Sequence, residues 1–156
     1  MTQAPVVRRD VVVRGTPEQA FAAFTERMDD IKPKEHNLLA SPLVSTTFEP
    51  HVGGHIVDRA EDGTECRWAR VLAYEPPHRV VFSWDIGPTW QLERPENASE
   101  VEVRFVADGA ERTRVQLEHR NLDRHGPGWP ALRDGVDNEQ GWPLYLARFA
   151  ELLDAA

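Results

Sequence analysis

The sequence predicts an α+β domain in which a curved seven-stranded antiparallel sheet wraps around a long C-terminal helix, with two short helices after the first strand. Turn residues divide Phe48–Trp84 into strand-like runs, apolar and polar residues alternate over Ser99–Val106 and Thr113–Arg120, and the last segment has apolar residues at helical spacing. A chain of 156 residues is long enough to bury a core, so we expect one domain over residues 1–156.

The N-terminal part predicts a strand followed by two helices. Val6–Val13 is rich in β-branched residues, which favour strands. Thr16 can cap a helix that begins at Pro17, and Gln19 completes a capping box. The apolar stripe of this helix comprises Ala20, Phe21, Phe24 and Met28. A second helical piece is expected at Asp29–Lys32.

Six further strands should form the rest of the sheet. We expect them at Leu43–Glu49, His55–Ala60, Glu65–Tyr74, Arg79–Trp84, Ser99–Val106 and Thr113–Arg120. Alternation in the run that ends at Trp84 predicts a half-buried strand. Ile86–Ala98 has no periodicity and is expected to be a loop, whereas Asp108 and Gly109 predict a hairpin turn.

The C-terminal third changes to helical spacing. A short helix is expected near Trp129–Asp134, and the last helix should begin near Gln140–Trp142 because Pro143 is tolerated only in a first turn. The apolar side of this last helix comprises Trp142, Tyr145, Leu146, Phe149, Leu152 and Leu153. A sheet curled around it would enclose a wedge-shaped space, where small apolar ligands usually bind.

Composition excludes several function classes. The net charge of −8 argues against binding to nucleic acid or an anionic membrane, because phosphate binding needs clustered basic residues. No apolar run approaches the ~18 residues of a membrane helix, and the N-terminus does not resemble a signal peptide. The lone Cys66 fits a reducing cytoplasm. Two glycines separate His51 from His55, so no shared helix face offers a metal site, and we expect no cofactor.

Several segments carry a resemblance to a known family. They are Thr16–Phe21, Glu49–Gly54, Asp62–Cys66, Arg70–Pro77, Val81–Trp84, Ser99–Val103, Thr113–Val115 and Gly141–Pro143. In this order and spacing they resemble the START-like (SRPBCC) superfamily with the helix-grip fold, and within it the bacterial proteins related to the activator of heat shock protein 90 ATPase. The chain departs from that family at Ala69, where the family usually has glycine. The resemblance implies the fold and a cavity but no particular reaction, because this superfamily hosts cyclases, lipid carriers and hormone receptors.

The apolar faces of the sheet and the last helix indicate the residues of the cavity wall. These are Phe24, Trp68, Val80, Phe82, Trp84, Val103, Leu117, His119, Trp142, Tyr145, Leu146 and Phe149. His119 follows the inward face of its strand, and a core histidine is favoured over a general base because no partner acid is evident. Asp123 and His125 are interpreted as part of a solvated loop.

Three functions remain open from the sequence. The favoured one is non-catalytic binding of a small hydrophobic or aromatic molecule, with no catalytic residue assigned. An enzyme of the cyclase or hydrolase kind would use His119 or a cavity arginine such as Arg67 or Arg70. A chaperone regulator would act through a protein partner, and a homodimer is compatible with any of the three.

Overall fold

A computed structural model of the protein describes residues 4–34 and 36–155. The strands are β1 (Val7–Arg14), β2 (Leu43–Phe48), β3 (His55–Ala60), β4 (Glu65–Glu75), β5 (Arg79–Trp84), β6 (Ser99–Ala107) and β7 (Arg112–Arg120). The helices are α1 (Pro17–Glu26), α2 (Met28–Ile31), α3 (Trp129–Asp137) and α4 (Trp142–Asp154), with 3-10 turns η1 (Pro95–Asn97) and η2 (Leu122–His125). The predicted fold class is confirmed, and most predicted elements match to within one or two residues.

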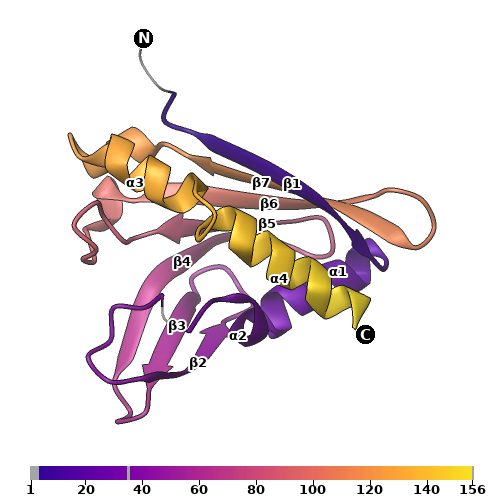
Figure 1. The fold of residues 1–156 in the computed structure, drawn as a ribbon, viewed down its shortest axis with the longest axis horizontal. Helices are drawn as coiled ribbons and strands as arrows, with labels where there is room; N and C mark the ends of the chain where they lie inside the picture. The colour runs from indigo at the N-terminus through magenta and orange to yellow at the C-terminus, as the bar shows by residue number, and fades with distance from the viewer. Residues whose placement is uncertain (1–3, 35, 156) are drawn as a thin grey trace.

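The sheet is antiparallel throughout and has the order β1-β7-β6-β5-β4-β3-β2. Strands β2 to β7 form a meander, and β1 pairs with the last strand, in register from Val7 opposite His119 to Arg14 opposite Arg112. Figure 1 shows that the sheet curls and that α4 lies across it. This arrangement leaves the first turn of α4 close to the ends of β5, β6 and β7, where the candidate site lies.

Local sequence determines how α1 begins. The Thr16 hydroxyl accepts from the Gln19 backbone N–H at 3.2 Å, and the Gln19 side chain accepts from the Thr16 N–H at 2.9 Å. This reciprocal capping box satisfies two N–H groups that the helix would otherwise leave unpaired. The capping prediction is therefore confirmed.

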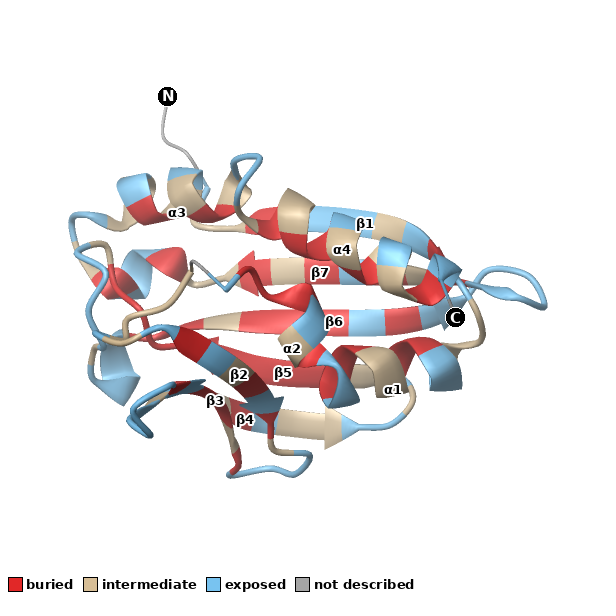
Figure 2. Ribbon diagram, turned by 60° about the horizontal axis from the view of Figure 1, so that its bottom comes forward, coloured by how far each residue is buried: buried red, intermediate tan, exposed pale blue. Residues whose placement is uncertain are grey.

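An aromatic core joins the helices to the sheet. Phe24 of α1 contacts Phe82 of β5, Phe105 of β6 and Phe149 of α4, with ring centroids 5.7 to 6.5 Å apart. All four side chains are buried, and the inner residues of the central strands are buried with them (Figure 2). Burial of such side chains, at roughly 1.5–3 kcal/mol each, holds α1 and α4 on the sheet.

The prediction that β5 is half-buried is wrong, because both of its faces are buried from Val80 to Trp84. It is the middle strand of the seven, and its outward Val81 pairs with Glu102. Arg79 and Arg120 bind the Glu102 carboxylate, so ion-paired side chains cover this outer face. Alternation on a central strand therefore did not indicate exposure to water.

Candidate functional site

A pocket of about 390 Å³ opens between the sheet, the β5–β6 loop and the junction of α3 with α4. Its lining combines four tryptophans with a few polar side chains. The lining residues are Lys32, His36, Asn37, Leu38, Trp68, Trp84, Ile86, Trp90, Gly135, Val136, Asn138, Gln140, Gly141, Trp142 and Tyr145. This is the size and composition of a site for a small organic molecule.

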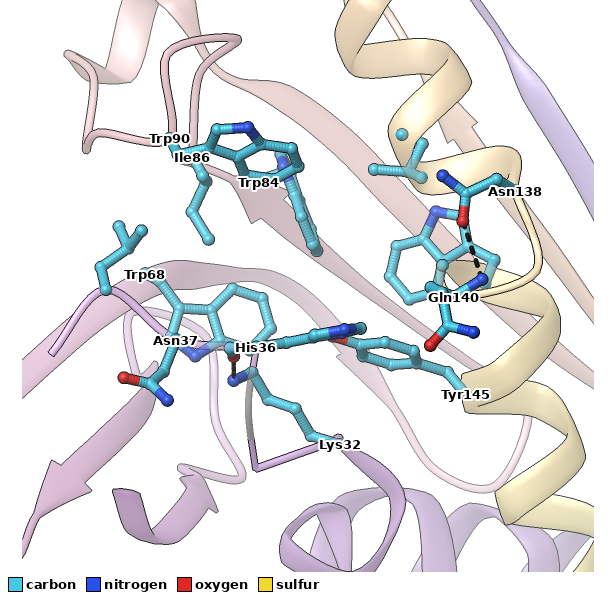
Figure 3. A pocket seen from close by; sticks show the side chains of 15 residues that line it. Lys32, His36, Asn37, Trp68, Trp84, Ile86, Trp90, Asn138, Gln140 and Tyr145 are labelled. Carbon is cyan, nitrogen blue, oxygen red and sulfur yellow. Dashed lines mark hydrogen bonds between the residues drawn. The ribbon is translucent and has the colours of Figure 1, made fainter. Parts of the chain in front are cut away.

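Aromatic rings form most of the pocket wall. The Trp84 ring lies 5.4 Å from Trp68 and 5.4 Å from Trp142, both in edge-to-face geometry. Across the pocket, His36 stacks on Tyr145 at 6.1 Å (Figure 3). Such a wall favours a flat aromatic guest, since it presents ring faces and edges to it.

The β5–β6 loop brings Trp90 to the mouth of the pocket. A turn closed by the Trp90 N–H and the Gly87 carbonyl at 2.9 Å, and a bridge between Ile86 and Leu92, hold this loop as a narrow hairpin. Trp90 adopts a left-handed backbone with φ of 59° and is 55% exposed, although it lines the pocket. A large apolar side chain in a strained conformation at a pocket mouth is a candidate ligand contact.

Among the lining residues within 4–34 and 36–155, Lys32 is the one Lys, Arg, Asp or Glu. Its buried ammonium donates to Asp58 Oδ2 at 3.0 Å and to the His36 carbonyl, and it lies 5.7 Å from the Trp68 ring centroid. Asp58 also accepts from the Thr46 hydroxyl at 2.7 Å. A buried charge needs such partners, so this ion pair fixes α2 and the following loop against β3.

A chain of buried hydrogen bonds runs behind the pocket wall and joins five side chains. The Trp142 indole donates to His119 Nδ1 at 3.1 Å, and His119 Nε2 lies 2.7 Å from the Ser99 hydroxyl. The Ser99 hydroxyl lies 2.8 Å from His125 Nε2, and His125 Nδ1 lies 2.6 Å from Glu93. We call this series, from Glu93 to Trp142, the polar relay.

Groups that can only donate a hydrogen bond fix the direction of every hydrogen bond in the relay. The Trp142 N–H can only donate, so His119 carries its hydrogen on Nε2 and donates to Ser99. The Ser99 backbone N–H donates to His125 Nε2 at 3.2 Å, so that nitrogen accepts and the other donates to Glu93. Every polar atom of the two imidazole rings therefore has a partner.

These partners decide the roles of the two histidines. Complete burial, assisted by the neighbouring His125, lowers the pKa of His119 to about 3. His119 is thus a neutral core residue, as favoured from the sequence, and so low a pKa makes it too weak a base to take a proton from a substrate near neutral pH. The interpretation of His125 as a solvated residue is wrong, because η2 folds it over Ser99 and buries it.

Ser99, His125 and Glu93 are hydrogen-bonded to one another in the same order as the serine, histidine and acid of a catalytic triad. The Ser99 side chain is completely buried, however, and its oxygen is engaged by both histidines. We therefore assign the three residues a structural role, because a nucleophilic serine needs space beside its oxygen for a substrate.

The expected cavity residues fall into three groups. Trp68, Trp84, Trp142 and Tyr145 line the pocket. Behind it, a void of about 10 Å³ touches the second group, which consists of Phe24, Phe82, Leu117 and Leu146. The third group, made of Val80, Val103, His119 and Phe149, is buried in the core. Sequence reasoning missed Trp90, Ile86, His36 and the α3–α4 junction, all of which lie in or beside segments without periodicity.

Neither arginine considered for catalysis lines the pocket. Arg70 pairs with Asp85 at 3.1 Å, and Arg67 lies 3.9 Å from Glu65 with most of its side chain exposed. Burial, followed by the charge of Asp58, raises the pKa of the Cys66 thiol, which disfavours the reactive thiolate. Across residues 4–34 and 36–155, no cluster of three or more His, Cys, Asp or Glu could hold a metal ion, and no helix could span a membrane.

Comparison with known proteins places this geometry in context. The family model described as "Activator of Hsp90 ATPase homolog 1-like protein" matches residues 14–154. An anthrahydroquino-gamma-pyrone synthase, Txn09, complexed with SUM, is 40% identical to this chain with a TM-score of 0.67, and the match covers 96% of this chain and 97% of the synthase. No curated protein sequence matches this chain.

Two further solved structures illustrate the range of similar proteins. The self-sacrificing resistance protein CalC from Micromonospora echinospora is 29% identical, with a TM-score of 0.71 and coverage of 97% and 95%. The Aha1 dimer from Colwellia psychrerythraea is 14% identical, with a TM-score of 0.65 and coverage of 95% of both chains. At 14% identity the likeness to the Aha1 dimer shows the shared fold alone.

Proposed function

The chain belongs to the family of activator of Hsp90 ATPase homolog 1-like proteins, and within it we propose that this member binds a small, flat aromatic molecule in the pocket. The observation that carries the proposal is the set of four tryptophans around one space of about 390 Å³. Burial of a guest's apolar surface against these rings, at about 25 cal/mol per Å², would supply most of the binding free energy.

Two features of the wall support binding over a purely structural role. The relay and the Lys32–Asp58 pair hold opposite sides of the pocket in fixed positions, so the site is formed before a ligand enters. A preformed site avoids part of the ordering cost of binding. Trp90 remains more than half exposed at the mouth, where a guest would cover it.

Native mass spectrometry of the purified protein tests the proposal. A bound guest adds a mass that disappears on denaturation, and an added aromatic compound of two to four fused rings should produce a one-to-one complex. The variant Trp90→Ala, which removes the exposed ring at the mouth, should lower the complexed fraction. A bare protein mass with every such compound would contradict ligand binding.

Ring closure on a bound polyketide-like precursor is a second candidate. It is favoured by the 40% identity to a gamma-pyrone synthase over 96% of this chain. A gamma-pyrone forms when a hydroxyl adds to a ketone in the same molecule and water leaves. The pocket would accelerate this step by holding the two reacting groups together, a contribution that can reach about 7–11 kcal/mol in well-oriented systems.

A model substrate separates catalysis from binding. An ortho-hydroxyaryl diketone closes to a chromone with loss of one water, and the product is followed by its ultraviolet absorbance. The protein should raise the closure rate at catalytic concentration, and Trp90→Ala should reduce that rate. Binding of the diketone without faster closure would retain the carrier function and reject the synthase.

The remaining expectations stay predictions. A role as a chaperone regulator predicts stimulation of ATP turnover by a heat-shock ATPase, measured with the purified pair. A homodimer predicts a doubled mass in solution at micromolar concentration. Cytoplasmic location agrees with the single cysteine, which is half-buried in β4.

A further inference from the structure

We infer that the pocket selects aromatic guests that carry hydrogen-bond-accepting oxygens, such as quinones and aryl ketones. The inference rests on the proposed function and specifies its ligand class. It predicts that an aromatic hydrocarbon of the same shape binds more weakly. The unpaired donors of the wall lead to this class.

The charged group nearest the pocket is already compensated. Lys32 lines the pocket, and its ammonium lies 3.0 Å from the Asp58 carboxylate and 5.7 Å from the centre of the Trp68 ring. Because a paired charge has little net field, the hydrogen-bonding groups of the wall define the ligand class.

The unpaired donors of the pocket define the ligand class. The indole nitrogens of Trp68 and Trp84 are buried, and neither has a hydrogen-bond partner within residues 4–34 and 36–155. The third buried indole, Trp142, has its partner in His119. Buried N–H groups are nearly always paired, and only an acceptor can pair them. Both rings line the pocket, so an oxygen of a guest that approaches them can accept this hydrogen bond.

Hydrocarbon walls alone would not distinguish between guests of equal shape. An aromatic hydrocarbon covers the rings but leaves both N–H groups unpaired. A quinone covers the same rings and also accepts a hydrogen bond. The inferred class is therefore defined by what differs between two molecules of one size.

Isothermal titration calorimetry with two tricyclic probes tests the inference on the unmodified protein. The probes are an anthraquinone sulfonate and the anthracene sulfonate with its sulfonate at the same position, which differ in two carbonyl groups. We expect the quinone to bind about tenfold tighter than the hydrocarbon, which corresponds to about 1.4 kcal/mol.

Matched variants identify the donors. Trp68→Phe and Trp84→Phe each keep an aromatic ring but remove one unpaired N–H, and at least one of them should reduce the quinone preference to about twofold. The control Trp90→Phe changes an exposed ring at the mouth and should leave the preference unchanged. Circular dichroism establishes that each variant is folded before its affinities are compared.

The outcomes separate this inference from the proposed function. Equal affinity for quinone and hydrocarbon overturns the inference and leaves aromatic binding in place. A preference that survives in both Trp68→Phe and Trp84→Phe overturns the assignment of the donors. Failure of both probes to bind overturns the inference together with the proposed function.

Discussion

The indole N–H of Trp142 donates to Nδ1 of His119 at 3.1 Å, across the interface between α4 and β7. This bond joins a residue of the pocket wall to a fully buried imidazole and sets the tautomer of that imidazole. Through Ser99 and His125 the same relay reaches Glu93 in the β5–β6 loop. Two sides of the pocket, the β5–β6 loop and the start of α4, are thereby hydrogen-bonded through one buried histidine, His119.

Replacement of His119 should destabilise the protein strongly. His119→Ala leaves the Trp142 N–H and the Ser99 hydroxyl with one partner fewer and creates a cavity, so we expect a loss of about 2–5 kcal/mol in the free energy of unfolding. His119→Asn retains an acceptor for the Trp142 indole and should recover part of that loss. Urea unfolding followed by tryptophan fluorescence measures both. Equal losses for the two variants would show that the hydrogen bond to Trp142 contributes nothing.

The ionisation of His119 predicts an acid-dependent loss of stability. Its pKa falls from 6.5 to about 3 on folding, because burial and then His125 disfavour the charged ring. Between these pH values the unfolded chain binds one proton that the folded protein does not bind. The free energy of unfolding is therefore highest above pH 6.5 and decreases as the pH falls toward 3. The slope approaches about 1.4 kcal/mol per pH unit for one proton.

Unfolding free energies measured from pH 7 to 4 test this sign. His119→Asn lacks the titrating group, so its stability should fall less steeply than that of the wild type over the same interval. Carboxylates contribute equally to both proteins and cancel in the difference. Parallel curves for the two proteins would refute the assignment of the slope to His119.

The junction of α3 with α4 should tolerate no side chain at Gly141. A Cβ there would overlap the backbone carbonyl of Val136, which cannot move without breaking the end of α3. We expect Gly141→Ala to cost roughly 3 kcal/mol or more, since overpacking against backbone displaces both helices. At Gly135 a Cβ would lie 3.5 Å from Trp90, an ordinary contact, so the control Gly135→Ala should be neutral or slightly stabilising. Thermal unfolding compares the two.

The β5–β6 loop should depend on the small size of Gly87. A Cβ at this position would overlap the Glu93 carboxylate and push it away from His125. Gly87→Ala should therefore cost about 1–3 kcal/mol through the displaced carboxylate and weaken ligand binding through the displaced loop. The exposed Thr89→Ala in the same loop is the matched control. Unchanged stability in Gly87→Ala would contradict a structural role for the Glu93–His125 contact.

Trp90 should matter for binding but not for folding. Its side chain is more than half exposed, so Trp90→Ala should change the free energy of unfolding by less than about 1 kcal/mol. Loss of its ring from the pocket mouth should lower the affinity for an aromatic ligand by about tenfold, because aromatic contacts contribute roughly 0.5–1.5 kcal/mol beyond the burial of their area. Calorimetric titration and urea unfolding of one preparation measure the two effects. A large stability loss without an affinity change would assign Trp90 to the fold.

Most of the fold could be predicted because its signals are local. The capping box around Thr16 lies within four residues, and the alternation over Thr113–Arg120 directly reports which side chains face inward. The central strand β5 was the exception, since ion pairs from neighbouring strands cover its outer face. Those pairs join residues about twenty positions apart, a distance at which periodicity carries no information.

The candidate site was only partly predictable for the same reason. Trp84 and Trp142 could be placed opposite each other from the sheet face and the helix stripe, and their rings lie 5.4 Å apart. Trp90 and Ile86 lie in a segment without a period, so nothing in the sequence pattern directed them to the pocket. The relay had one readable signal: Ser99 and His119 are polar residues at inward positions of paired strands. Their partners His125 and Glu93 come from turns whose folding the sequence does not specify.

The most direct test of an aromatic site is a titration followed by the five tryptophan indole N–H signals in a nitrogen-15 correlation spectrum. Four tryptophans line the pocket, and the fifth, Trp129 of α3, does not, so it serves as an internal control. On addition of the anthraquinone sulfonate, the account predicts saturable shifts of the indole signals of Trp68, Trp84, Trp90 and Trp142, with Trp129 unchanged. No shift in those four signals, or a shift of Trp129 as large as theirs, would contradict a binding site in this pocket.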